Sequence, residues 1–111
     1  MTYAVLVTPA AKAEIYEFID YVANVKQEPL NADRLVDVID EGILSLRRLP
    51  QRCPHPPEND LVPFEVRSLV LKKTLVVLYH VNEERQRVEV LGFRHGRRSP
   101  LDLSSRQGEP S

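Results

Sequence analysis

Residues 74–81 read TLVVLYHV, and this stretch decides the fold. Its β-branched and aromatic residues predict a strand, and its apolar residues follow one another without alternation, which is typical of a central strand buried on both faces. Two further strand patterns flank it, over residues 64–71 and from residue 87 to residue 93 or 95. Short turns at Lys72-Lys73 and at residues 82–85 join the three. The C-terminal half is therefore expected to form three closely spaced strands.

Two amphipathic helices are predicted ahead of these strands. A short strand over residues 3–7 ends at Thr8-Pro9, where Thr can cap a helix and Pro is tolerated at the first helical position. Apolar residues then recur at helical spacing over about residues 9–24. After Pro29 and Asn31 a second helix is predicted to about Leu49, and Gly42 in its middle is expected to allow a close approach of the first helix.

The resulting order, β-α-α-β-β-β, predicts an α+β fold in which a helical hairpin packs on one face of a mainly antiparallel four-stranded sheet. The other face of the sheet is expected to be uncovered and to leave room for a functional site. Residues 50–63 hold five of the nine prolines and predict an irregular loop. Residues 1–100 are assigned to a single domain, and the polar residues 101–111 to a disordered tail.

Length and composition exclude several classes of protein. The 111 residues carry 15 basic and 16 acidic side chains, a net charge of −1, which argues against neutralisation of a nucleic-acid backbone or polybasic attachment to a membrane. The longest apolar run, residues 75–79, is too short to span a bilayer, and no signal-peptide pattern is present, so a cytoplasmic protein is expected. With a single cysteine, Cys53, and scattered histidines, neither a metal nor a cofactor is expected.

The charges are unevenly distributed along the chain. Residues 1–60 carry 6 basic and 10 acidic side chains, a net charge of −4, whereas residues 61–111 carry 9 basic and 6 acidic side chains, a net charge of +3. Eleven of the fifteen basic residues are arginine, which suits bidentate recognition of carboxylates. A domain with two oppositely charged halves fits protein partners better than a nucleic-acid backbone.

Four segments, in order along the chain, resemble the ParE/RelE superfamily of type II toxins. Together they cover about residues 3–100, and the ending after the last strand is the most specific. The segments are the opening Val5-Leu6-Val7-Thr8-Pro9-Ala10-Ala11, the helix stretch Ala32-Asp33-Arg34-Leu35 with Ile39, Leu46 and Leu49-Pro50, the strand pair Val66-Arg67-Ser68-Leu69-Val70 and Val77-Leu78-Tyr79-His80-Val81, and the ending Val90-Leu91-Gly92-Phe93-Arg94-His95-Gly96-Arg97-Arg98-Ser99-Pro100.

This resemblance implies one of two activities. RelE-like members cut messenger RNA on the ribosome with basic residues and a C-terminal Tyr or His, because cleavage without a metal needs proton transfer and charge stabilisation. ParE-like members poison DNA gyrase through protein contacts. RelE-like sequences place an Arg three residues before the Tyr of the central strand, where this chain has Val76, and neither Tyr nor His follows Arg98. The sequence is therefore closer to ParE-like members.

The resemblance to ParE implies a gyrase inhibitor held in check by a cognate ParD-like antitoxin in a hetero-oligomer, with no cofactor, no membrane association and no direct nucleic-acid binding. The alternative, an mRNA interferase, would use Arg67, His80, His95 and Arg97. A third alternative is a degenerate member that acts only as an interaction module.

A basic cluster at the end of the last strand holds the candidate contact residues. Arg94, His95, Arg97 and Arg98, together with Arg67, are predicted to bind the target or an acidic antitoxin segment through charge-assisted hydrogen bonds. The structural alternative is a solvated strand end whose arginine stems cover the edge of the core. For Arg67 the alternative is an ion pair with Glu65.

Overall fold

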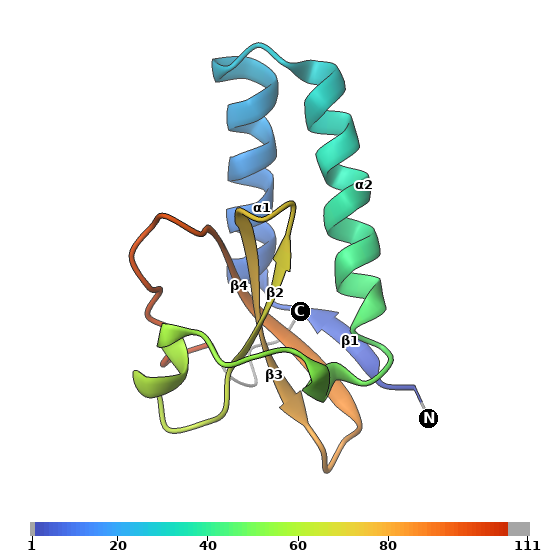
Figure 1. The fold of residues 1–111 in the computed structure, drawn as a ribbon, viewed down its shortest axis with the longest axis vertical. Helices are drawn as coiled ribbons and strands as arrows, with labels where there is room; N and C mark the ends of the chain where they lie inside the picture. The colour runs from blue at the N-terminus through green and yellow to red at the C-terminus, as the bar shows by residue number, and fades with distance from the viewer. Residues whose placement is uncertain (1, 107–111) are drawn as a thin grey trace.

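The computed structural model describes residues 2–106 and confirms the α+β fold with the order β-α-α-β-β-β (Figure 1). The strand order in the sheet is β1-β4-β3-β2, in which β1 runs parallel to β4 and the other neighbours are antiparallel. The elements are β1 (Ala4–Val7), α1 (Pro9–Asp20), the π-helical turn η1 (Tyr21–Val25), α2 (Pro29–Ser45), the 3₁₀ turns η2 (Pro50–Arg52) and η3 (Pro57–Asp60), β2 (Arg67–Leu71), β3 (Leu75–Asn82) and β4 (Arg87–His95).

Thr8 joins the start of α1 to the sheet. Its hydroxyl accepts a hydrogen bond from the Ala11 amide at 3.3 Å, as an N-cap does, and donates one to the Val90 carbonyl of β4 at 2.9 Å. The side chain is buried, so both bonds are shielded from water. The entry of the helical hairpin is thereby fixed on the last strand.

The boundaries of α2 differ from the prediction at both ends. The helix begins at Pro29, which occupies a first-turn position where a missing N–H costs nothing. It ends at Ser45 instead of Leu49, because the amides of Leu46, Arg47 and Arg48 bond three residues back and tighten the last turn. Leu49 then leaves the helical path with φ of 45°. The Arg52 guanidinium donates to the carbonyls of Arg48 at 2.7 Å and Leu49 at 3.1 Å, which satisfies groups that follow the helix end.

The main core lies between the helical hairpin and the sheet. Tyr79 of β3 is fully buried, and its hydroxyl donates to the Pro50 carbonyl. Burial raises the pKa of Tyr79, and the neighbouring Cys53 raises it further. The buried residues of this core are Ala11, Ile39, Leu46, Cys53, Leu75, Val77, Tyr79, Val81, Val88, Val90 and Phe93.

Gly42 permits a close approach, but of β2 instead of α1. A Cβ built at Gly42 would lie 2.7 Å from a methyl group of Leu71. The prediction of a contact with the first helix is therefore wrong: the glycine lets α2 settle against the edge strand of the sheet.

The second face of the sheet is covered, so the prediction of an open face is wrong. A second apolar cluster forms there from Val66, Val76, Leu78, Leu91 and Leu103, with Val62, Phe64 and Leu101 packed against it. Strand β2 consequently begins at Arg67 instead of residue 64, because the chain before it turns across this face. The Val66 amide donates to the Asn59 side chain at 2.9 Å and takes no part in the sheet.

Residues 101–106, predicted to belong to a disordered tail, are packed on the sheet; we call them the C-terminal strap. Leu103 is fully buried in the second cluster. The Arg106 guanidinium bonds to the Glu14 carboxylate of α1 at 2.8 Å and to the Leu91 carbonyl at 3.0 Å. The strap is held because its two leucines remove apolar surface of the sheet from water. Residues 107–111 lie outside the described part of the chain.

Candidate functional site

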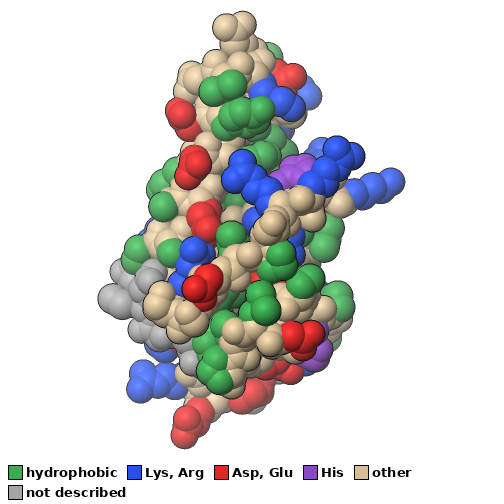
Figure 2. Space-filling view, turned by 90° about the vertical axis from the view of Figure 1, so that its left-hand side faces the viewer, with side chains coloured by type: hydrophobic (Ala, Val, Ile, Leu, Met, Phe, Trp, Pro, Cys, Tyr) green, Lys and Arg blue, Asp and Glu red, His purple; other side chains and the backbone are tan. Residues whose placement is uncertain are grey.

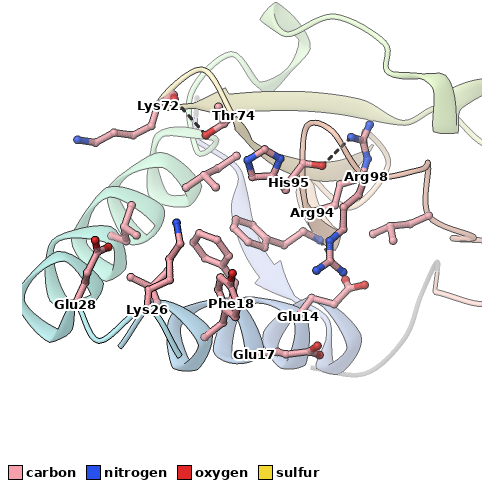
Figure 3. Close-up of a pocket in the computed structure, with 16 residues that line it drawn as sticks. Glu14, Glu17, Phe18, Lys26, Glu28, Lys72, Thr74, Arg94, His95 and Arg98 are labelled. Atoms are coloured by element: carbon pink, nitrogen blue, oxygen red, sulfur yellow. Dashed lines mark hydrogen bonds between the residues drawn. The ribbon is translucent and has the colours of Figure 1, made fainter. Parts of the chain in front are cut away.

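A groove of about 610 Å³ lies between the helical hairpin and one end of the sheet (Figure 3). It exists because the hairpin extends beyond the turn between β2 and β3 (Figure 1). The apolar residues that line it come from both helices and from the sheet, with Phe18 and Phe93 in ring contact at 5.4 Å. They are Phe18, Tyr21, Val22, Leu35, Leu75, Phe93 and Leu101.

The two long walls of this groove differ in charge. The helical wall carries charges of both signs, from Glu14, Glu17, Lys26 and Glu28. The end of the sheet contributes Lys72, Arg94, His95 and Arg98 (Figure 3). Glu14 is already engaged, since it accepts a hydrogen bond from the Phe93 amide at 3.1 Å and binds Arg106. The helical wall therefore has little net charge, whereas the sheet wall has a positive net charge.

The sheet wall is built from two turns that are bonded to each other. The Gly96 amide, just after β4, donates to the Thr74 carbonyl of the β2–β3 turn at 2.6 Å. His95 then organises its own turn, because its Nδ1 accepts the Arg97 amide at 3.1 Å and its carbonyl accepts the Arg98 amide at 3.1 Å.

These two turns bring four exposed cations together, namely Lys72, Lys73, Arg97 and Arg98. Figure 2 shows Lys and Arg side chains gathered around a His side chain on one part of the surface. In the part of the chain from residue 2 to residue 106, none of the four takes part in an ion pair. The four charges are free to meet acidic groups of a partner.

Arg94 does not stand with these exposed cations, although the sequence placed it in the same cluster. Its side chain is 7% exposed and forms a two-point ion pair with Glu58, which is fully buried. The Leu101 amide donates to the same carboxylate at 3.0 Å. Burial raises the pKa of Glu58, but the hydrogen bonds from Arg94 and Leu101 outweigh it, so the pKa lies below its usual value.

Arg67 lies in β2, opposite Tyr79 of β3 and away from these turns. It forms the ion pair with Glu65 that its position suggested, at 3.3 Å. It also donates to the Cys53 carbonyl at 2.7 Å. Glu65 binds His55 at 3.0 Å as well, and chiefly this hydrogen bond lowers the pKa of the Glu65 carboxyl group. Arg67 is thus committed to structural contacts within the chain.

The four residues named for the mRNA-interferase alternative fall into two separate pairs. His95 is paired with Leu75 in the sheet, and Arg67 is paired with Tyr79. Four residues of strand separate these positions, a distance of about 13 Å. His80 stays at the Arg67 end, where its Nδ1 lies 2.7 Å from the Glu65 carbonyl. The structure therefore places Arg67 and His80 at one end of the sheet, and His95 and Arg97 at the other.

Lys72, which lines the groove, and its neighbour Lys73 are predicted from the sequence only as a turn. The sequence does mark these two residues as unusual, since Gly and Asn are the usual residues of a tight hairpin turn and lysine is not. The helical wall has no signal in the sequence, because the periodicity of a helix does not show which segment lies opposite it.

Within residues 2–106 no group of three or more His, Cys, Asp or Glu side chains is placed to hold a metal ion. Over the same residues, every helix is too short or too polar to cross a membrane.

Comparisons with known proteins identify relatives of this fold. A family model described as the ParE toxin of type II toxin-antitoxin system, parDE, matches residues 5–100. A structure of the chromosomal ParDE system from P. aeruginosa is 24% identical and covers 85% of this chain and 96% of that chain, with a TM-score of 0.66. The RelBE2 toxin–antitoxin complex from Mycobacterium tuberculosis is 21% identical and covers 86% and 92%, with a TM-score of 0.62. A search of curated proteins gave no significant match.

Proposed function

The chain belongs to the ParE toxin family of type II toxin–antitoxin systems, and from this premise we propose that it acts in the cytoplasm by binding and inhibiting DNA gyrase. A cognate antitoxin keeps it inactive in a toxin–antitoxin hetero-oligomer. The protein works by contact with other proteins and not by cleaving a substrate.

The groove between hairpin and sheet is the observation that supports this proposal. Its apolar floor, formed around Phe18, Leu35 and Leu75, is the kind of surface that receives the apolar face of an amphipathic helix. Exposed Tyr21 at the end of α1 extends the apolar surface. We assign this groove to the antitoxin.

The scattering of candidate catalytic residues favours gyrase over messenger RNA as the target. General acid–base catalysis needs its groups within hydrogen-bond reach of one substrate, and the pairs Arg67–His80 and His95–Arg97 lie about 13 Å apart along the sheet. Val76, at the position where RelE-like sequences carry an Arg, is buried in the second apolar cluster. A ribosome-bound message would therefore contact only two of the four candidate catalytic residues at either end of the sheet.

Three assays test the proposal: growth of cells that express the chain, supercoiling by purified gyrase, and cleavage of a message on purified ribosomes. Expression of the chain alone should arrest growth, and co-expression of the antitoxin encoded beside it should restore growth. The purified toxin should reduce supercoiling by gyrase, and ribosomes programmed with a message should show no new cleavage in its presence. Cleavage of the message with supercoiling intact would reassign the chain to the interferases, and soluble folded protein without any growth effect would identify a degenerate member.

A matched pair of variants relates the basic cluster to this activity. Arg97→Glu/Arg98→Glu should weaken binding of antitoxin or gyrase, because it reverses two exposed charges beside the groove. Arg34→Glu/Arg85→Glu, a reversal of two exposed charges on α2 and the β3–β4 turn, is the control. Equal affinities of the two variants would leave the cluster with a purely structural role.

A further inference from the structure

The β2–β3 turn places lysine where the backbone is strained. Lys72 and Lys73 both have positive φ, 52° and 65°, and the Thr74 amide closes the turn on the Leu71 carbonyl at 3.2 Å. Side chains other than Gly and Asn pay a conformational cost in this left-handed region, and Asn-Gly is the least strained pair for a tight hairpin turn. The chain therefore carries two charges here at the expense of local stability.

The β2–β3 turn lies beside the turn that carries the arginines after β4. The bond from the Gly96 amide to the Thr74 carbonyl holds the turns together, and Lys72 and Arg98 both line the groove (Figure 3). Lys73 and Arg97 stand next to them along the chain. Fixed backbone bonds thus hold the two turns that carry these four cations, two of which line the groove, before any partner arrives, which reduces the entropy lost on binding.

The helical wall lacks this excess of positive charge. Glu14 is neutralised by Arg106, and the other charged residues of this wall are Glu17, Lys26 and Glu28. An amphipathic helix that packs its apolar stripe on the groove floor can point in either direction along the groove. Reversing its direction exchanges the two sides of the helix that face the two walls. Only one of these directions brings an acidic edge against the sheet wall.

We propose that Lys72, Lys73, Arg97 and Arg98 form a clamp for acidic side chains along one edge of the antitoxin helix, and that this clamp fixes the direction in which the helix lies in the groove. The inference rests on the proposed function, in which an amphipathic segment of the antitoxin occupies the groove. A phosphate backbone fits the site less well, since it would face the apolar floor and Glu17.

The decisive variant is Lys72→Asn/Lys73→Gly, which relaxes the turn and removes two charges at once. Its melting temperature should equal or exceed that of the wild type, whereas its affinity for the purified antitoxin should fall about 10-fold and depend less on salt. Lys72→Gln/Lys73→Gln retains the strained turn without charge and should lose affinity to a similar extent. Arg34→Gln/Arg85→Gln, with the same net charge, is the control and should bind as the wild type does.

Synthetic probes separate charge from shape. A helical peptide with a leucine stripe and glutamates along one edge should bind the wild type more tightly than the isomer with glutamines at those positions, and the difference should vanish in Lys72→Asn/Lys73→Gly. Equal binding of both peptides, an equal loss in the control variant, or tighter binding of a single-stranded RNA oligonucleotide at these lysines would overturn the clamp. Antitoxin that binds the wild type and the clamp variants equally refutes the clamp alone, whereas failure of the antitoxin to bind the wild type at all refutes the proposed function.

Discussion

The ion pair between Glu58 and Arg94 shows how a single buried contact organises two irregular segments. Glu58 belongs to the proline-rich loop, Arg94 to β4, and the Leu101 amide that joins them belongs to the strap. A buried ion pair is costly to form, because both charges leave water, and it contributes stability only while its hydrogen bonds are complete. Removal of one partner therefore leaves the other charge buried without compensation.

Substitution of Glu58 tests this directly. Glu58→Ala should lower the free energy of unfolding by about 3–5 kcal/mol, since Arg94 then stays buried without an acceptor. Urea denaturation measures the loss, with Glu84→Ala in the exposed β3–β4 turn as a control within about 0.5 kcal/mol of the wild type. The double variant Glu58→Met/Arg94→Met should recover much of the stability. A loss below about 1 kcal/mol for Glu58→Ala would mean that the pair is not closed in solution.

Acid should weaken the same contact. The pKa of Glu58 is lowered below its ordinary value of 4.5 in the folded chain, so its contribution is fully present above pH 4.5 and is lost as the pH falls through the folded pKa. In Glu58→Gln this group no longer titrates. The difference in stability between the wild type and Glu58→Gln should therefore shrink steadily between about pH 5 and pH 2, as urea denaturation at each pH would show. A difference independent of pH would indicate that the carboxyl group is not ionised in the folded state.

At the scale of elements, hydrophobic periodicity predicted the helices and the strands β3 and β4 closely. It could not predict the cover of the second face, because Val62, Phe64, Leu101 and Leu103 are isolated apolar residues in irregular segments, and such segments have no period. The Glu58–Arg94 pair was equally invisible, since its members lie 36 positions apart. Of the candidate site, the arginines after β4 were found because they adjoin a recognisable strand, whereas Lys72 and Lys73 gain significance only from the turn opposite them.

The strap should behave as part of the core. Leu103→Ala should cost about 2–5 kcal/mol, because it opens a cavity against Leu78 and Leu91 in a fully buried position. Leu61→Ala, at a site that is 61% exposed, is the matched control and should change stability little. Thermal denaturation compares the two. Equal melting temperatures would show that the strap detaches from the sheet in solution.

In the molecule as a whole the helical hairpin forms one layer and the sheet another, with the groove at the end where the hairpin extends beyond the sheet (Figure 1). Contacts at the other end, including the Arg67–Glu65 ion pair and the Tyr79–Pro50 bond, hold the chain together. The charge distribution of the sequence agrees with this arrangement in part: acidic residues lie chiefly on the helices, and Lys72, Lys73, Arg97 and Arg98 lie on the turns of the sheet.

Binding at the groove should raise the stability of the whole domain. Antitoxin at 100 times its Kd should increase the free energy of unfolding by about 2.7 kcal/mol, because it binds only the folded toxin. Tyr21→Asp places a charge at a groove-lining position that is 47% exposed, so it should fold normally and lose this stabilisation. Denaturation with and without antitoxin gives both values. Equal stabilisation of wild type and variant would place the antitoxin elsewhere on the surface.

The parallel pairing of β1 with β4 has a consequence for the timing of synthesis. Thr8, directly after β1, bonds to Val90, 82 positions later, and Glu14 binds Arg106, 92 positions later. At about 5–20 residues per second, the ribosome needs several seconds to supply these partners. The first strand and both helices therefore emerge without the sheet they pack on. A chain interrupted before β4 has neither groove nor cationic wall, and only a completed chain can poison a cell or require neutralisation.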